Sequence, residues 1–173
     1  ISKRCMNPGL RICDDVVLQW RDVDLVSGTI SITKTVLRIT NIDASQTAKT
    51  KVVIQAPKTQ ASIRIIPIPD RIMGYLQVHK SEDKIYLASG KTTFTEPRQH
   101  QYQFRKILSQ AGIPYHKFHV LRHTFATRCI EQGVDVKSLS EILGHSSVTI
   151  TMQRYVHPSL EMKRTQINKL TQI

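Results

Sequence analysis

The chain has 173 residues and is 40% hydrophobic, so it can form one folded domain with a sizeable core, and its composition argues against intrinsic disorder. It carries 25 Lys and Arg against 13 Asp and Glu, and the formal charge of +12 indicates a polyanionic partner, either nucleic acid or an acidic membrane surface. No secretory signal and no run of about 18 apolar residues is found, so we expect no membrane partner, and the spread of basic residues along the chain favours nucleic acid.

The first part of the chain predicts a short helix followed by a small antiparallel sheet. Apolar residues recur at helical spacing within 11–20. β-branched residues are frequent at 29–40, 52–55 and 61–68, which predicts strands, and the polar segment 41–51 predicts a long loop.

From residue 71 onward the pattern is helical apart from a short predicted strand at 84–88. The later helices are predicted at 98–111, 119–132, 136–143, 148–155 and 159–170. Gly112, Gly133 and Gly144 follow three of them as C-terminal stops, and Asp135 precedes one as an N-cap. The predicted fold class is therefore α+β, a mainly helical domain with a small antiparallel β-sheet near the N-terminal half.

The densest group of chemically active residues begins the predicted helix 119–132. Positions i, i+3 and i+4 share one side of a helix, so His119, Arg122 and His123 project together near the positive end of the helix dipole. Two imidazoles and a guanidinium so placed suit a phosphate. The histidine spacing also fits zinc ligands, and His123 could simply satisfy a hydrogen bond in the core. No Glu follows His119 and Arg122 would repel a cation, so no metal site is predicted.

A third histidine and a tyrosine follow this group. His145 lies in the sequence LGH, and Tyr155 comes ten residues later. A tyrosine near the end of a helix is usually a packing residue, but the order HxxRH, LGH and Tyr155 resembles the C-terminal signature of the tyrosine recombinase (phage integrase) family.

Two earlier motifs extend the resemblance over residues 9–158. The segments GLRICD at 9–14 and WRDVD at 20–24 look like the first arginine motif of the family. The segments APKT at 56–59 and RIIPI at 64–68 look like its β-hairpin lysine motif. Integrases of phages and of conjugative or integrative elements are the most similar members.

The resemblance implies the catalytic domain of a site-specific recombinase, which cleaves and rejoins DNA through a covalent 3′-phosphotyrosyl intermediate without metal, cofactor or ATP. It implies Tyr155 as the nucleophile. The other positions that match catalytic residues of the family are Arg11, Lys58, His119, Arg122 and His145. Asp14 and His123 are expected to support the site.

This chemistry needs such residues because an attacked phosphodiester accumulates negative charge. Arg11 and Arg122 can neutralise the phosphate oxygens in place of a metal ion, and His145 can donate a further hydrogen bond. A tyrosine hydroxyl has a pKa of about 10, so its ionised form at pH 7 lies about 4 kcal/mol uphill. His119 is the candidate base for its proton, and Lys58 is the candidate acid for the leaving 5′ oxygen.

We expect double-stranded DNA as the partner. The chain is expected to be a monomer in isolation and to form a homotetramer on DNA. It is expected to be encoded by a bacterium or a phage and to act in the cytoplasm, associated with the nucleoid. The three cysteines lack metal-like spacing and fit a reducing compartment. Residues 1–173 are expected to form the catalytic domain of a longer protein, without the N-terminal DNA-binding domain, and 159–173 to form a tail. The candidates for contacts with the DNA backbone are Arg64, Arg71, Arg98, Lys106 and Lys117.

Three alternatives remain open at this point. Residues 126–155 imitate a helix-turn-helix regulator without catalysis, although that leaves Arg11, Lys58 and His119 unexplained. A topoisomerase-type nicking and closing enzyme would use the same tyrosine chemistry. A zinc hydrolase would use His119 and His123.

Overall fold

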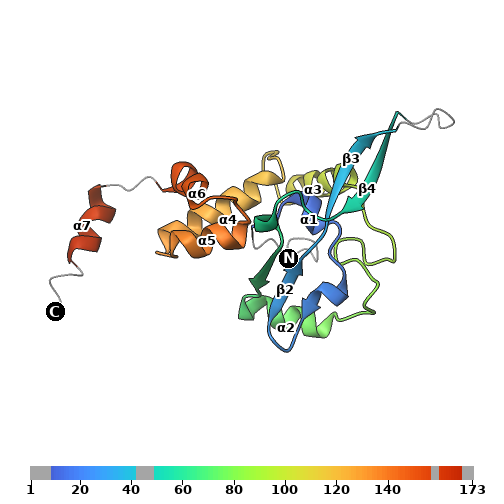
Figure 1. Cartoon of the computed structure of the whole chain (residues 1–173), viewed down its shortest axis with the longest axis horizontal. Coiled ribbons are helices and arrows are strands. Elements are labelled where there is room, and N and C mark those ends of the chain that lie inside the picture. Colours follow the sequence, from blue (N-terminus) through green and yellow to red (C-terminus); the bar gives the residue numbers. More distant parts are fainter. Residues whose placement is uncertain (1–8, 42–48, 157–159, 169–173) are drawn as a thin grey trace.

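A computed structural model describes residues 9–41, 49–156 and 160–168 (Figure 1). The helices are α1 (Ile12–Asp15), α2 (Asp70–Val78), α3 (Pro97–Gln110), α4 (His119–Glu131), α5 (Val136–Leu143), α6 (Val148–Tyr155) and α7 (Leu160–Asn168). The strands are β1 (Val23–Asp24), β2 (Thr29–Ile32), β3 (Thr35–Thr40), β4 (Thr50–Gln55) and β5 (Arg64–Pro67). Two 3-10 helices are η1 (Trp20–Asp22) and η2 (Gln60–Ser62).

The strands form two antiparallel sheets rather than one. β2 lies between β1 and β5 in a three-stranded sheet, with Ile30 opposite Ile66, whereas β3 and β4 form a separate hairpin that projects from the domain in Figure 1. The predicted strand 29–40 is split because its halves enter different cores. Ile30 packs with Leu76 of α2, while Val36 packs with Val16 and Val17. The predicted α+β class is confirmed.

A helical layer made of α4, α5 and α6 lies above and to the left of α2 in Figure 1. Its core consists of Ala126, Leu139, Leu143 and Tyr155. The predicted ends of α5 are confirmed, because Asp135 Oδ2 accepts a hydrogen bond from the Ser138 backbone N–H at 2.8 Å and the residue after Leu143 adopts a left-handed conformation.

Some predicted elements are shorter than expected or absent. The helix predicted at 11–20 is limited to α1, because Val16, Val17 and Leu18 are all buried and one helix face cannot bury three consecutive side chains. No strand forms at 84–88 in the described chain. A single β-bridge joins Gln19 to Tyr86 there, and it extends no further.

The last described helix, α7, stands apart from the rest of the domain in Figure 1. It confirms a helix within the predicted range 159–170, although residues 159 and 169–173 lie outside the described part of the chain. Two of its apolar side chains, Leu160 and Ile167, are 83% and 62% exposed.

Candidate active site

Three arginines converge on the C-terminal end of α5. The hydrogen bonds run from Arg64 Nε to Ile142 O at 2.7 Å, from Arg122 Nη2 to Leu143 O at 2.7 Å and from Arg11 Nη2 to Gly144 O at 2.9 Å. The last carbonyls of a helix have no partner within the helix and carry the negative end of its dipole, so they suit guanidinium groups. The end of α5 therefore holds the three positive charges close together.

Arg122 occupies the most enclosed position of the three. It is 2% exposed, and its Nη1 donates a second hydrogen bond to Gly9 O at 2.6 Å. Burial, followed by the charges of Arg11 and Arg64, lowers the pKa of Arg122 to about 10, so the side chain is still cationic at pH 7. Two of its five N–H groups are used by backbone carbonyls, which fixes the plane of the guanidinium.

Arg64 lies inside the domain, which corrects its expected role as a contact to the DNA backbone. Its guanidinium donates to Asp14 Oδ2 at 3.4 Å and to Ser62 O at 2.9 Å, besides the bond to α5, and both charged side chains are only 5% exposed. Arg11 lies 4.0 Å from the same carboxylate. The carboxylate of Asp14 thus lies beside two of the arginines, and its supporting role stays a prediction.

A glycine is required where α5 ends. Gly144 has φ of 64°, and a Cβ built on it would lie 3.0 Å from both Ala61 O and Arg64 Nη1. A side chain at this position would therefore be strained in its backbone and would crowd Ala61 O and the guanidinium of Arg64.

Tyr155 lies between two histidines in the helical layer. Its ring centroid is 5.6 Å from that of His123 and 6.4 Å from that of His145. The rings of Tyr155 and His145 are nearly parallel, with 5° between their planes. The rings of His119 and His123 lie edge to face, with 4.5 Å between their centroids. Tyr155 is 7% exposed, and its hydroxyl has no hydrogen-bond partner among the described residues.

All three of these histidines have lowered pKa values. Burial, followed by the charges of Arg122 and Arg11, lowers the pKa of His145 to about 4. Burial, followed by neighbouring positive charges that include Arg122, also lowers the pKa of His119 and of His123. The imidazoles are therefore neutral at pH 7, so each carries one N–H donor and one acceptor nitrogen.

His145 is also fixed by a hydrogen bond to α6. Its Nδ1 lies 2.7 Å from Oγ1 of Thr151, a residue with no exposed surface. Thr151 precedes Tyr155 by one helical turn, so the two share a side of α6.

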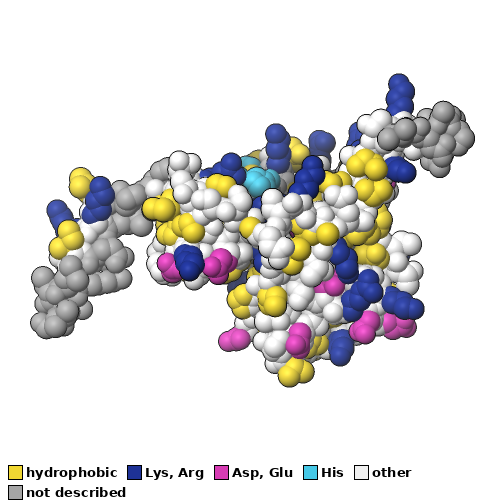
Figure 2. All heavy atoms as spheres, in the orientation of Figure 1, with side chains coloured by type: hydrophobic (Ala, Val, Ile, Leu, Met, Phe, Trp, Pro, Cys, Tyr) yellow, Lys and Arg dark blue, Asp and Glu magenta, His cyan; other side chains and the backbone are white. Residues whose placement is uncertain are grey.

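Lys58 is exposed and lies between β4 and η2. Within the described residues it makes no hydrogen bond or ion pair with any other residue of the candidate site. Four further basic candidates are exposed, namely Arg71, Arg98, Lys106 and Lys117. Arg71 is the second residue of α2, which Figure 1 places on the side of the domain away from α6. In Figure 2, Lys and Arg side chains lie around the histidines on the upper edge, and most visible acidic side chains lie on the lower side.

Sequence reasoning missed three residues of this site. Arg64 had the wrong role, because only the fold shows that β5 passes beneath the end of α5. Arg154 lowers the pKa of all three histidines, and its position beside Tyr155 could have indicated this. Thr151 could have been found from its spacing of four residues from Tyr155 on the predicted helix.

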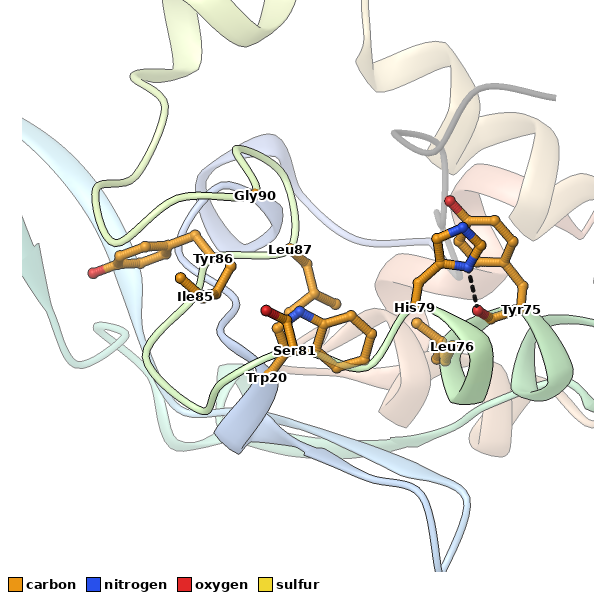
Figure 3. Close-up of a pocket in the computed structure, with 9 residues that line it drawn as sticks. All are labelled: Trp20, Tyr75, Leu76, His79, Ser81, Ile85, Tyr86, Leu87 and Gly90. Atoms are coloured by element: carbon orange, nitrogen blue, oxygen red, sulfur yellow. Dashed lines mark hydrogen bonds between the residues drawn. The ribbon is translucent and has the colours of Figure 1, made fainter.

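The pocket drawn in Figure 3 lies elsewhere, between α2 and the segment 81–90, and has a volume of about 210 Å³. Aromatic side chains of Trp20, Tyr75, His79 and Tyr86 line it, and none of the candidate catalytic residues does.

Across the described residues, no group of three or more His, Cys, Asp or Glu could hold a metal ion. None of the described helices is long and apolar enough to span a membrane.

Comparisons with known proteins identify relatives of the whole chain. The model of the phage integrase family matches residues 3–162. A protein of Caldanaerobacter subterraneus subsp. tengcongensis, described as tyrosine recombinase XerC-like, is 31% identical over 182 residues, which cover 95% of this chain and 46% of that protein. The chain spans less than half the length of such curated relatives.

Solved structures show the same fold. The integrase of transposon Tn1549, in complex with transposon right-end DNA, matches with a TM-score of 0.69 at 23% identity, covering 95% of this chain and 55% of that one. The XerA recombinase matches with a TM-score of 0.63 at 26% identity, covering 94% of this chain and 52% of that one. These matches favour neither a helix-turn-helix regulator nor a topoisomerase.

Proposed function

This chain belongs to the phage integrase family, and from that membership we propose that it is the catalytic domain of a site-specific DNA recombinase. The observation that carries the proposal is the position of Tyr155, whose ring packs against the neutral imidazoles of His123 and His145 and whose buried, unpartnered hydroxyl interacts electrostatically with Arg122. A nucleophile for a phosphodiester needs this combination of a free hydroxyl, a nearby proton acceptor and fixed positive charge.

In the first step, Tyr155 Oη becomes accessible and attacks the phosphorus, and its proton passes to a histidine. We propose His119 for this role because it matches the first histidine of the family motif, and it lies against His123, the neighbour of Tyr155. The bond from phosphorus to the 5′ oxygen breaks, and Lys58 protonates that oxygen when its turn approaches the DNA. A 3′-phosphotyrosyl link and a free 5′ hydroxyl result. A 5′ hydroxyl from another strand then attacks the link and releases Tyr155, so the phosphodiester is re-formed without ATP.

Arg11, Arg122 and His145 are proposed to bind the non-bridging oxygens during both steps. Arg122 has three N–H groups left beyond the two that donate to carbonyls, and Arg11 has four left beyond its bond to Gly144. Because backbone carbonyls already hold both guanidinium groups, little reorganisation is needed when charge develops on the phosphate.

Duplex DNA is the proposed partner, and the exposed candidates Arg98, Lys106 and Lys117 would contact its backbone. If 6–10 phosphates are neutralised, affinity is expected to fall by about 10³–10⁵-fold between 50 and 200 mM salt. We also propose that residues 1–173 act within a longer protein. Four copies of that protein would assemble on DNA, with α7 of each copy docking on a neighbouring copy. The protein would act in the bacterial cytoplasm, on the DNA of the nucleoid. The exposed Leu160 and Ile167 support such docking.

The proposal is tested with a library of nicked duplexes whose sequence is randomised around the nick. The short strand beyond the nick diffuses away after cleavage and leaves the protein covalently trapped. We expect a denaturant-stable adduct with the native chain in the presence of EDTA, and none with Tyr155→Phe. An adduct that survives Tyr155→Phe, or DNA binding at micromolar protein without any adduct, would overturn the proposal.

A further inference from the structure

Thr151 is the feature of the site that carries an inference beyond the roles assigned above. Its hydroxyl is completely buried, and it lies 2.7 Å from His145 Nδ1. The described residues offer this hydroxyl no other hydrogen-bond partner. His145 Nε2 has no hydrogen bond within the described chain, so it is the nitrogen left for a ligand.

A hydrogen-bond account of this pair distinguishes the two tautomers of the neutral imidazole. If Nδ1 carried the proton, it would donate to Thr151 Oγ1, and the hydroxyl hydrogen would be left buried without an acceptor. Such an unsatisfied group is disfavoured by about 1–3 kcal/mol. If Thr151 instead donates to Nδ1, the buried hydroxyl hydrogen has an acceptor, and the imidazole proton must lie on Nε2, the nitrogen left for a ligand.

We propose that Thr151 is a positioning residue that donates its hydroxyl hydrogen to His145 Nδ1 and thereby keeps His145 as an Nε2–H donor toward the scissile phosphate. The part that concerns the phosphate rests on the proposed function. The opposite tautomer would present a lone pair to an anion, which would repel it.

The same hydrogen bond links His145 to the helix of the nucleophile. Thr151 and Tyr155 are one turn apart on α6, and the ring of His145 lies parallel to that of Tyr155. The donor tautomer is therefore selected only while α6 is docked on the end of α5. The position of Tyr155 and the tautomer of His145 thus both depend on the docking of α6.

The tautomer can be read directly by long-range ¹H–¹⁵N correlation on the full chain labelled with ¹⁵N-histidine at pH 7. The His145 signals are identified by their loss in His145→Gln. We expect the Nε2–H pattern in the native chain and in Thr151→Ser, which retains the hydroxyl, and a mixture of tautomers in Thr151→Val. Thr149→Val changes an exposed threonine of the same helix and should keep the native pattern. An Nδ1–H pattern in the native chain would overturn the proposal even if Thr151→Val failed to fold.

Cleavage of the nicked duplex gives the second measurement. Thr151→Val is expected to slow single-turnover cleavage about 10–100-fold with little change in DNA affinity, and Thr151→Ser to recover most of the rate. In a His145→Gln background, Thr151→Val should have no further effect on the rate. Equal effects of Thr151→Val in both backgrounds would contradict a role through His145. If the native chain cleaves no duplex, the proposed function fails, whereas the tautomer measurement still decides the role of Thr151.

Discussion

Arg64 and Asp14 form a buried ion pair, with 3.4 Å between Nη2 and Oδ2 and only 5% of either side chain exposed. The pair joins β5 to α1, and Arg64 also reaches the last turn of α5 through Ile142 O. Three segments far apart in the sequence are thereby joined at one point. Two of the proposed phosphate ligands, Arg11 and Arg122, are held by the same end of α5.

Replacement of Arg64 is predicted to destabilise the domain strongly. Arg64→Met keeps much of the side-chain volume but leaves the carboxylate of Asp14 buried with only a distant contact to Arg11, which costs about 3–5 kcal/mol in the free energy of unfolding. Urea unfolding measures this loss. Arg71→Met, at an exposed position of α2, is the matched control and is expected to change stability by less than about 0.5 kcal/mol. Equal effects of the two variants would show that the buried pair contributes little.

A second prediction compares two glycines that end helices in the same backbone conformation. Gly144 and Gly112 have φ of 64° and 67°, but a Cβ on Gly112 would meet nothing within 4 Å, whereas one on Gly144 would crowd Ala61 O and Arg64. Gly112→Ala is expected to cost about 1 kcal/mol in the free energy of unfolding, from the left-handed backbone alone.

Gly144→Ala is expected to cost about 1–2 kcal/mol more than Gly112→Ala, because it adds a collision to the same backbone strain. Thermal or urea unfolding of both variants gives the difference. Cleavage by Gly144→Ala should also fall, since the arginines must shift. Equal stabilities for the two variants would mean that the end of α5 relaxes without resistance.

The third prediction concerns pH. His145 has its pKa lowered to about 4 in the folded chain, against about 6.5 in an unfolded one. Between these values the unfolded state binds more protons at this site, so the folded state is expected to lose stability as the pH falls from about 6.5 to about 4. His145→Gln cannot bind that proton, and its free energy of unfolding should fall less steeply over this range.

Urea unfolding at several pH values between 7 and 4 tests this expectation. His116→Gln replaces an exposed histidine and serves as the control. A slope for His145→Gln as steep as that of the native chain would exclude His145 as a source of the pH dependence.

The last prediction concerns Lys58 as the proton donor. Lys58→Ala should leave stability unchanged, because the side chain is exposed, and should slow cleavage about 10²–10⁴-fold. A substrate with sulfur at the bridging 5′ position releases a thiolate, which needs no proton to leave. With that substrate Lys58→Ala should cleave at nearly the native rate, as should Lys51→Ala, an exposed lysine of β4, with either substrate. A deficit of Lys58→Ala that persists with sulfur would assign the lysine to DNA binding instead.

Much of the helical half could be predicted from the sequence because its signals are local. Asp135 and Gly144 mark the ends of α5, and α6 has its predicted bounds from Val148 to Tyr155. The motifs around Arg11, His119, Arg122, His145 and Tyr155 also indicated the family. The N-terminal half was less predictable, since its short elements are set by which core each side chain enters, as at the division between β2 and β3.

The sequence by itself determined which chemical groups the chain has and the order in which they occur, because helix caps and side-chain spacing act over a few residues. Only the tertiary structure decided where those groups meet. Arg64 reads as one basic residue among 25 Lys and Arg, and nothing local distinguishes it from a DNA contact. It is internal because β5 passes under the C-terminal carbonyls of α5, a contact between residues 78 positions apart. Hydrogen bonds of that kind depend on packing, and no local pattern encodes them.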